Sequence, residues 1–338
     1  MMSYELIGIT VLWFFLYGYL IVASIDFGAG FFAYYAKITK KDHIINQLIS
    51  RYLSPVWEVT NVFFVFFFVG LVGFFPDTAY YYGQSLLIPG SIAIVLIAIR
   101  GSFYAFESYG SKDNTVYMFF YGATGLLIPA SLSTALTISE GGYIEETSNG
   151  VQLLYGELLS SPYSWSVVFL AIVSVLYISA MFLVYYAARA NDQPALQLVK
   201  KYALFWSSPT IIASLTTFIA LSQQNPEHFQ RAIELWWVFG ISVAFFMAAV
   251  FLMYQGKYYG WAFIAVMFQF FFAFFGYGAS HLPYILNPYI TLTSGVTNES
   301  MAVALIVVFI AGLCLLIPSL VMLMRMFLFD ADYVKGKK

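Results

Sequence analysis

The sequence has very little charge. Only 9% of its 338 residues are Asp, Glu, Lys or Arg, whereas soluble domains carry about 25%. Apolar residues make up 61%, and the mean hydropathy is +0.81. The net charge is -2, and the Lys and Arg residues are spread over many loops, which excludes the basic surface of a nucleic-acid-binding protein. Composition therefore indicates an integral membrane protein with no nucleic-acid partner.

Cysteine and histidine are scarce as well. Cys314 is the only cysteine, so the chain has no disulfide framework or thiolate metal site of its own, and we expect Cys314 to be a small buried apolar residue. A haem in a bilayer needs axial His or Met on facing helices. The three histidines, His43, His228 and His281, fall in predicted loops or at the end of a predicted span, where His281 is expected to cap a helix. We therefore expect no haem, other cofactor or metal bound by this chain alone.

Long apolar runs dominate what the sequence does contain. Runs of about 20 residues bounded by polar or turn residues predict transmembrane helices, because barrel strands are about half as long and alternate in polarity. The predicted spans cover approximately residues 5–35, 55–75, 80–104, 116–137, 164–188, 203–222, 235–254, 258–280 and 301–327. The fold class predicted is an all-α polytopic membrane protein with nine spans, forming a single membrane domain over residues 1–338.

The distribution of Lys and Arg predicts the orientation. Fourteen of the fifteen lie in one set of alternate loops or in the C-terminal tail, and Arg231 alone lies in the other set. The positive-inside rule then places the N-terminus outside and the C-terminus in the cytoplasm. The two long external loops, 138–163 and 281–300, contain no Lys or Arg, and we expect their glutamates to be solvated: Glu140, Glu145, Glu146, Glu157 and Glu299.

Three charged residues interrupt apolar sequence. Asp26 lies in "VASIDFGAGFF" of the first span, Glu58 in "SPVWEVTNVFFVFFF" of the second and Arg100 in "SIAIVLIAIRGSFYAF" of the third. A charge at the centre of a membrane helix costs roughly 2.5–3.5 kcal/mol on insertion scales, so such residues are usually paired or functional. The predicted topology places all three in the cytoplasmic half of the bilayer. Because successive helices are usually neighbours, we expect them to meet at a common depth.

Two interpretations of this trio remain open on these residues alone. In the structural one, Arg100 pairs with one or both carboxylates and locks the first three helices together. In the functional one, the carboxylates line a wet cavity that passes protons inward from the cytoplasm, and Arg100 keeps one of them ionised. A secondary transporter is the alternative function, since intramembrane carboxylates also bind substrates and coupling ions. Carriers usually have matching sites in two related halves, however, and the later spans offer no matching set.

The residues around the trio resemble subunit II of the cytochrome bd quinol oxidases. That family ends its first span with a motif of the type GFD-x-G-x-G, and this chain has "SIDFGAG", which keeps Asp26, Gly28 and Gly30. The family's second span opens with P-x-W-D-x-x-x-V-W, which "PVWEVTNVF" resembles with Glu58 in place of Asp. Arg100, followed by Phe106 and Glu107, resembles the end of the third span with a stretched spacing. The two glycines are expected to permit close helix approach rather than to bind phosphate.

The resemblance implies a function and a set of partners. In this family, subunit I carries haems b and d and the quinol site, and subunit II is a haem-free partner that packs against it. The complex oxidises quinol, reduces dioxygen to water with cytoplasmic protons and so generates a proton motive force. Subunit II is expected to stabilise subunit I and to contribute a proton pathway, for which Asp26, Glu58 and Arg100 are the matching positions. A small single-span accessory subunit and a bound lipid or quinone are further possible partners. The cell membrane of a bacterium is the implied location.

Overall fold

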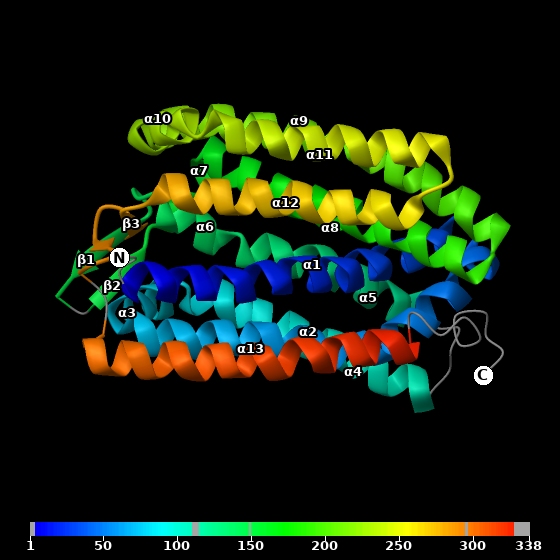
Figure 1. Ribbon diagram of the computed structural model, residues 1–338, viewed down its shortest axis with the longest axis horizontal. Helices are drawn as coiled ribbons and strands as arrows, with labels where there is room; N and C mark the ends of the chain where they lie inside the picture. Colours follow the sequence, from blue (N-terminus) through cyan, green and yellow to red (C-terminus); the bar gives the residue numbers. More distant parts are fainter. Residues whose placement is uncertain (1–3, 110–114, 149, 295–296, 328–338) are drawn as a thin grey trace.

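The structure is a computed structural model. It describes residues 4–109, 115–148, 150–294 and 297–327, with the side chains of all of these except residues 47, 50–59, 103–109, 323–324 and 326–327. Within these ranges the chain is mostly helical, and its long helices run roughly parallel or antiparallel to one another (Figure 1). The first of them begins at one end of the bundle and the last ends at the other.

The long helices correspond closely to the predicted spans. Those of 18 or more residues within the described ranges are α1 (Tyr4–Ile38), α2 (Asp42–Phe74), α4 (Leu87–Tyr109), α5 (Thr115–Leu132), α8 (Pro162–Ala190), α9 (Gln193–Gln224), α11 (Trp236–Gln255), α12 (Tyr259–His281) and α13 (Glu299–Phe327). By length and hydropathy, 7 helices in the described part qualify as spans, or up to 8 if a bent pair counts as one span. The chain is thus a polytopic helical membrane protein.

The start of the predicted third span is wrong. Residues 80–85 do not belong to α4 but to a separate short helix, α3 (Pro76–Ser85), which bends by 119° from the end of α2. Pro76 has no backbone N–H to donate, and Phe75 before it has a non-helical conformation with φ -132° and ψ 68°, so the helix breaks there. Hydropathy alone does not reveal this break, because the aromatic residues of α3 extend the apolar run.

Short helices and two hairpins gather at the end of the bundle where α1 begins (Figure 1). The helices are α3, α6 (Thr134–Ser139), α7 (Tyr155–Ser160) and α10 (Pro226–Glu234). Strands β1 (Ile144–Thr147) and β2 (Gly150–Leu153) form one antiparallel hairpin, and β3 (Tyr284–Leu286) and β4 (Ile290–Thr291) form another. The expectation of a purely α-helical chain is therefore wrong in detail, because the two long loops pair their own backbone groups where the helices stop.

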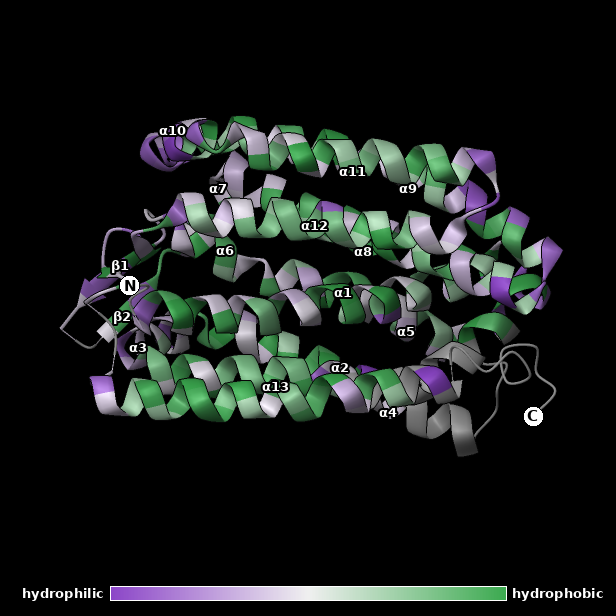
Figure 2. Cartoon of the chain, in the orientation of Figure 1, coloured by the Kyte–Doolittle hydropathy of each residue, from purple (hydrophilic) through white to green (hydrophobic). Residues whose placement is uncertain are grey.

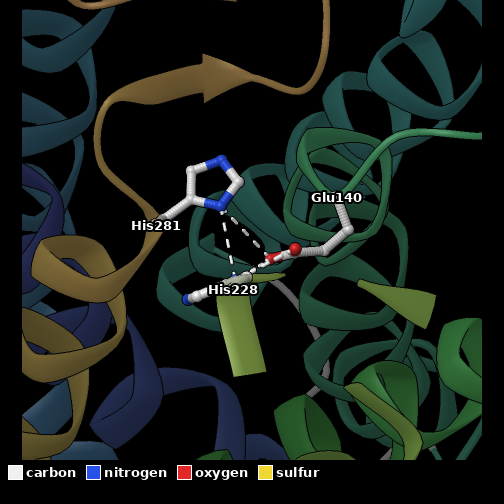
Figure 3. Close-up of side chains that lie close together, drawn as sticks. All are labelled: Glu140, His228 and His281. Carbon is white, nitrogen blue, oxygen red and sulfur yellow. Dashed lines mark hydrogen bonds and ion pairs between the residues drawn. The ribbon is translucent and has the colours of Figure 1, made fainter. Parts of the chain in front are cut away.

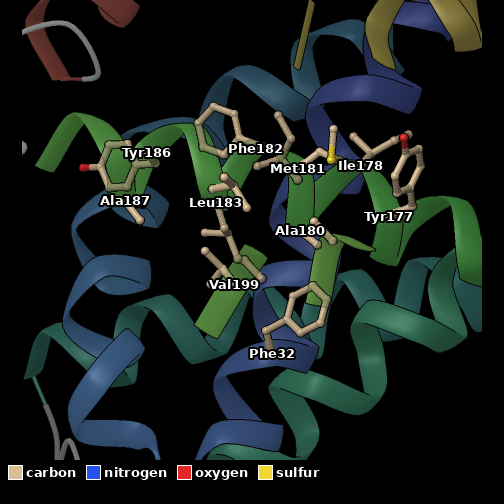
Figure 4. Packing of buried hydrophobic residues seen from close by; sticks show 14 of the residues in the cluster. Phe32, Tyr177, Ile178, Ala180, Met181, Phe182, Leu183, Tyr186, Ala187 and Val199 are labelled. Carbon is tan, nitrogen blue, oxygen red and sulfur yellow. The ribbon is translucent and has the colours of Figure 1, made fainter. Parts of the chain in front are cut away.

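Helices α1 and α8 form the centre of the bundle. In the most apolar stretch of α8, 72% of the residues are buried. The corresponding share is at most 39% in the other candidate spans of the described chain. Its residues Tyr177 to Ala187 form an apolar core with Phe32 of α1 and Val199 of α9 (Figure 4). On the other side, α1 packs against α2 and α5. Any polar group on the inner face of α1 is therefore enclosed by protein.

The outer helices expose apolar surface. Figure 2 shows hydrophobic residues along the lengths of the long helices and hydrophilic ones mainly at the bundle ends, as expected for a protein surrounded by lipid. Helix α13 carries Leu315 at 74% exposure. Cys314 beside it is also exposed, so the expectation that it is buried is wrong for the isolated chain. An apolar residue facing lipid or another chain has the same sequence signature as one facing a protein core.

Candidate functional site

The structure brings Asp26 and Arg100 together inside the bundle. The guanidinium Nε of Arg100 donates to Asp26 Oδ2 at 2.9 Å, and Nη2 donates to the backbone carbonyl of Asp26 at 2.6 Å. Both residues are 1% exposed. Asp26 lies on α1, twelve residues before its end at Ile38, which is about 18 Å along the helix axis. The predicted contact between the two residues is thus confirmed, and it is a buried, charge-assisted pair.

Helix α5 completes the surroundings of this ion pair. Arg100 Nη1 donates to the carbonyl of Tyr121 at 2.8 Å and lies 3.5 Å from Thr124 Oγ1. The guanidinium carbon lies 4.1 Å from the centre of the Tyr121 ring and 5.2 Å from that of Phe27. The Tyr121 hydroxyl in turn donates to Asp26 Oδ1 at 3.3 Å. These contacts distribute the arginine charge over hydrogen-bond acceptors and aromatic faces as well as one carboxylate.

Glycines allow the helices to approach closely enough for these bonds. A Cβ on Gly28 would lie 2.3 Å from Ser179 Cβ, and one on Gly30 would lie 2.8 Å from the Tyr121 carbonyl oxygen. On α5, a Cβ on Gly125 would lie 2.2 Å from the Phe27 carbonyl oxygen. Real Cβ atoms do not come so near, so the glycines of "DFGAG" serve close helix packing, as the sequence predicts.

The position of the Glu58 side chain relative to Asp26 and Arg100 is not described by the structure. The backbone of this residue belongs to α2, which packs against α1, but its side chain lies outside the described residues. Two of the three predicted site residues are therefore joined in a direct contact. A role of Glu58 beside them stays a prediction.

A second polar cluster lies at the end of the bundle that carries the hairpins. Glu140, the residue after α6, contacts His228 of α10, whose Nδ1 lies 2.9 Å from Glu140 Oε1 and 3.0 Å from Oε2. His281 at the end of α12 places its Nδ1 at 3.5 Å from Glu140 Oε1 and 3.4 Å from His228 Nδ1 (Figure 3). Figure 3 shows both imidazoles directed at the one carboxylate. Three segments far apart in sequence meet at this cluster.

Neighbouring side chains hold the Glu140 cluster in place. Asn225 Nδ2 donates to Glu140 Oε2 at 2.8 Å, and the Tyr277 hydroxyl donates to Oε1. His228 Nε2 lies 2.8 Å from Ser280 Oγ. Burial raises the pKa of the Glu140 carboxyl, but the hydrogen bond with His228 and the nearby ring of His281 outweigh it, so this pKa lies below its ordinary value.

Two sequence-based expectations are wrong at this cluster. Glu140 is only 2% exposed and not solvated, although Glu145, Glu146, Glu157 and Glu299 are exposed as expected. His281 contacts Glu140 and His228 across the bundle instead of only capping its own helix. One feature of the sequence could have indicated this cluster: His281 lies at a span boundary in a chain that has only three histidines. The sequence could not pair that histidine with residues 53 and 141 positions earlier.

The histidine pair does not suit axial ligation of a haem. The two rings have centroids 5.0 Å apart, and their Nδ1 atoms face the same carboxylate. Axial ligands must instead approach one iron from opposite faces of the macrocycle. The third histidine, His43, is exposed on α2 near the other end of the bundle.

Comparisons with known proteins agree over nearly the whole chain. A curated relative, named putative cytochrome bd menaquinol oxidase subunit II, from Bacillus subtilis (strain 168), is 32% identical over 342 residues and covers 98% of both chains. A chain in the structure of bd oxidase from Geobacillus thermodenitrificans is 60% identical, with a TM-score of 0.85 over 97% of this chain and 100% of that one. The family model for cytochrome bd terminal oxidase subunit II matches residues 4–327. This chain therefore belongs to the cytochrome bd terminal oxidase subunit II family.

Proposed function

We propose that this chain is the haem-free second subunit of a quinol oxidase that reduces dioxygen to water with cytoplasmic protons. The observation that carries this proposal is the family match over residues 4–327, together with a buried ion pair at the positions that resemble the family's motifs. In the proposed complex, this chain stabilises subunit I, which holds haems b and d and the quinol site. A single-span accessory subunit and a bound lipid or quinone belong to the same proposal.

The proposed topology has nine spans in one membrane domain over residues 1–338, with the N-terminus outside and the C-terminus in the cytoplasm. Its support is that α2 and α4, at 33 and 23 residues, are long enough to cross a bilayer that needs about 20. Added to the 7 candidate spans, they give the odd number that termini on opposite sides require. The end with the hairpins and the Glu140 cluster is then external, and the Asp26–Arg100 pair lies in the cytoplasmic half.

Within that topology, we assign different roles to the three charged residues. Asp26 and Arg100 form a fixed pair, because each already has several partners and neither is exposed. The pair positions α1, α4 and α5 at the inner end of the proposed pathway and holds a strong local field there. Glu58 is the proposed proton carrier, since it is the remaining intramembrane acid of the trio. Protons would pass from the cytoplasm along this subunit toward the oxygen-reducing haem of subunit I.

The family assignment also decides between the oxidase and the secondary transporter. A carrier would transport its substrate as an isolated chain, whereas an oxidase subunit works only beside its haem-bearing partner. Purification of this chain from native membranes through an affinity tag tests the difference. We expect a haem-bearing chain to co-purify and the complex to oxidise quinol with oxygen consumption. Substrate flux by the isolated chain in liposomes, with no haem protein co-purifying, would overturn the proposal.

A purely structural role of Asp26 can be separated from a role in proton transfer by measuring yield and turnover independently. If Asp26 only holds the helices, Asp26→Asn lowers the amount of assembled complex but leaves the turnover of each remaining complex normal. If the pair also serves the pathway, turnover per haem falls in the complexes that assemble. We expect both losses, and normal turnover per haem in Asp26→Asn would remove the pair from the pathway.

A further inference from the structure

The Glu140 cluster has the donor atoms of a metal site and no role in the proposed proton pathway. Asp26 lies 22 residues after the start of α1, about 33 Å from the end where Glu140, His228 and His281 lie. The three side chains offer one carboxylate oxygen and two imidazole nitrogens, all within 4.8 Å of one another, and all three are buried. The proposed proton pathway therefore does not account for this cluster.

The hydrogen bonds of Ser280 permit the tautomer in which His228 Nδ1 faces Glu140 without a proton. The Ser280 hydroxyl lies 2.9 Å from the Tyr277 carbonyl oxygen, to which it can donate, and 2.8 Å from His228 Nε2, from which it can then accept. In a neutral imidazole only one nitrogen carries hydrogen. His228 Nδ1 then directs a lone pair at two carboxylate oxygens, 2.9 and 3.0 Å away. In this tautomer the lone pairs of the imidazole and the carboxylate repel each other, and a metal ion between them would bind both.

His281 supplies a third donor atom beside the same carboxylate. Its Nδ1 lies 3.4 Å from His228 Nδ1 and 3.5 Å from Glu140 Oε1. A buried imidazole held by hydrogen bonds would normally use both nitrogens. His281 is 7% exposed, yet its Nε2 has no hydrogen-bond partner in the described part of the chain. Its Nδ1 is directed at the same carboxylate as His228 Nδ1 (Figure 3).

The spacing of the three donor atoms matches one face of a tetrahedron. The three edges, His228 Nδ1 to Glu140 Oε1, His228 Nδ1 to His281 Nδ1 and His281 Nδ1 to Glu140 Oε1, are 2.9, 3.4 and 3.5 Å long. With the metal–ligand distances of a zinc site, about 2.0–2.1 Å, tetrahedral neighbours lie roughly 3.3–3.4 Å apart. One point can therefore lie at bonding distance from all three atoms with little movement of the side chains.

We propose that Glu140, His228 and His281 bind one Zn²⁺ ion, with the fourth tetrahedral position left to water or another oxygen donor. Asn225, Tyr277 and Ser280 act as positioning residues, because they hold Glu140 and His228 through the hydrogen bonds described above. The ion would join the end of α6 to α10 and α12. Its role is to fasten three helices at the end of the bundle, and it carries out no redox step.

Metal content of the purified complex tests this site. The complex, carrying a tag without histidine, is stripped with a chelator, incubated with Zn²⁺, desalted and analysed for zinc per mole of this chain. We expect about one zinc in the wild type and in the control His43→Ala, whose histidine is exposed near the opposite end of the bundle. His228→Ala and His281→Ala should retain less than about a tenth of that amount, and Ser280→Ala should bind zinc 10–100-fold more weakly.

Two results would overturn the proposal. Absence of retained zinc in the wild type, or equal zinc in the wild type and both histidine variants, would mean that hydrogen bonds alone hold the cluster together. If the histidine variants fail to assemble, X-ray absorption at the zinc edge of the wild-type complex decides instead. We expect four nitrogen and oxygen ligands including two imidazoles, and a spectrum without imidazole scattering contradicts the site.

Discussion

Arg100 is a full charge that is 1% exposed in an apolar bundle, so its partners determine whether the fold tolerates it. The Asp26 carboxylate supplies the opposite charge, and two backbone carbonyls and two aromatic rings supply the remaining contacts. Removing one partner from a buried pair costs about 3–5 kcal/mol, because the other charge is left uncompensated. Replacing both partners by apolar or neutral groups often costs far less.

Asp26→Asn should therefore lower the thermal stability and yield of the complex strongly, and the double variant Asp26→Asn/Arg100→Met should recover much of both. The physical reason is that the second substitution removes the charge that the first one leaves unpaired. Thermal unfolding of the purified complexes, followed by loss of intact complex on gel filtration, measures the effect. A double variant that is no more stable than Asp26→Asn would show that the pair is not energetically coupled.

Tyr121 contributes to the same ion pair in two separable ways. Tyr121→Phe removes the hydroxyl that donates to Asp26 at 3.3 Å but keeps the ring beneath the guanidinium at 4.1 Å. We expect a loss of about 0.5–1.5 kcal/mol from the missing hydrogen bond. Tyr121→Leu also removes the aromatic face and should cost more in the same unfolding assay. Equal stability of the two variants would mean that the ring contact adds nothing.

The sequence identified some residues of these sites and not others. Asp26 and Arg100 could be predicted because a charge within an apolar run is conspicuous and because adjacent spans tend to pack together. Tyr121 and Thr124 could not, since a tyrosine or threonine in a membrane helix has no distinctive pattern. Glu140 was misjudged as solvated because its burial depends on His228 and His281, which lie 88 and 141 residues later in the sequence.

At the scale of the helices, close packing depends on small residues at the contact between α1 and α5. Lipid is as apolar as a leucine side chain, so membrane helices associate largely through van der Waals contact and polar bonds, both of which require short distances. Gly125 lies where the α5 backbone touches the Phe27 carbonyl of α1, one residue from the ion pair. Separation of these helices would also lengthen the bond from Arg100 to Tyr121.

Gly125→Ala should therefore lower the stability of the complex by about 1–3 kcal/mol or more, because its Cβ would lie 2.2 Å from the Phe27 carbonyl oxygen. Gly240→Ala in α11 is the matched control, since a Cβ there has no atom within 4 Å. The control should be neutral or slightly stabilising, because alanine favours helix over glycine. Equal melting temperatures of the two variants, measured side by side, would contradict tight packing of α1 and α5.

The long helices could be predicted from the sequence, whereas some of their ends and the break between α2 and α3 could not. Hydropathy placed each long helix to within a few residues at most ends, as for α8 and α12. It missed the first part of α2 from Asp42, because polar residues outside the apolar run continue the helix. It also merged α3 with α4, since a bend at Phe75 and Pro76 depends on backbone conformation and leaves the apolar pattern unbroken.

At the scale of the whole molecule, the two polar clusters lie toward opposite ends of the bundle. In the proposed orientation the Asp26–Arg100 pair is on the cytoplasmic side, where protons enter, and the Glu140 cluster is on the external side. The exposed apolar surface of the outer helices is available to lipid and to subunit I. The proposed delivery of protons by this chain to subunit I is best tested at Glu58.

The most direct measurement is oxygen-coupled proton uptake by the complex carrying Glu58→Gln. The control is Glu157→Gln, which changes an exposed glutamate of α7. Glutamine keeps the size of the side chain but cannot carry a proton, so assembly and haem content should stay normal. Oxygen consumption and its proton uptake should both slow by about tenfold or more in Glu58→Gln and remain unchanged in Glu157→Gln. Normal turnover in a fully assembled Glu58→Gln complex would contradict the proposed pathway.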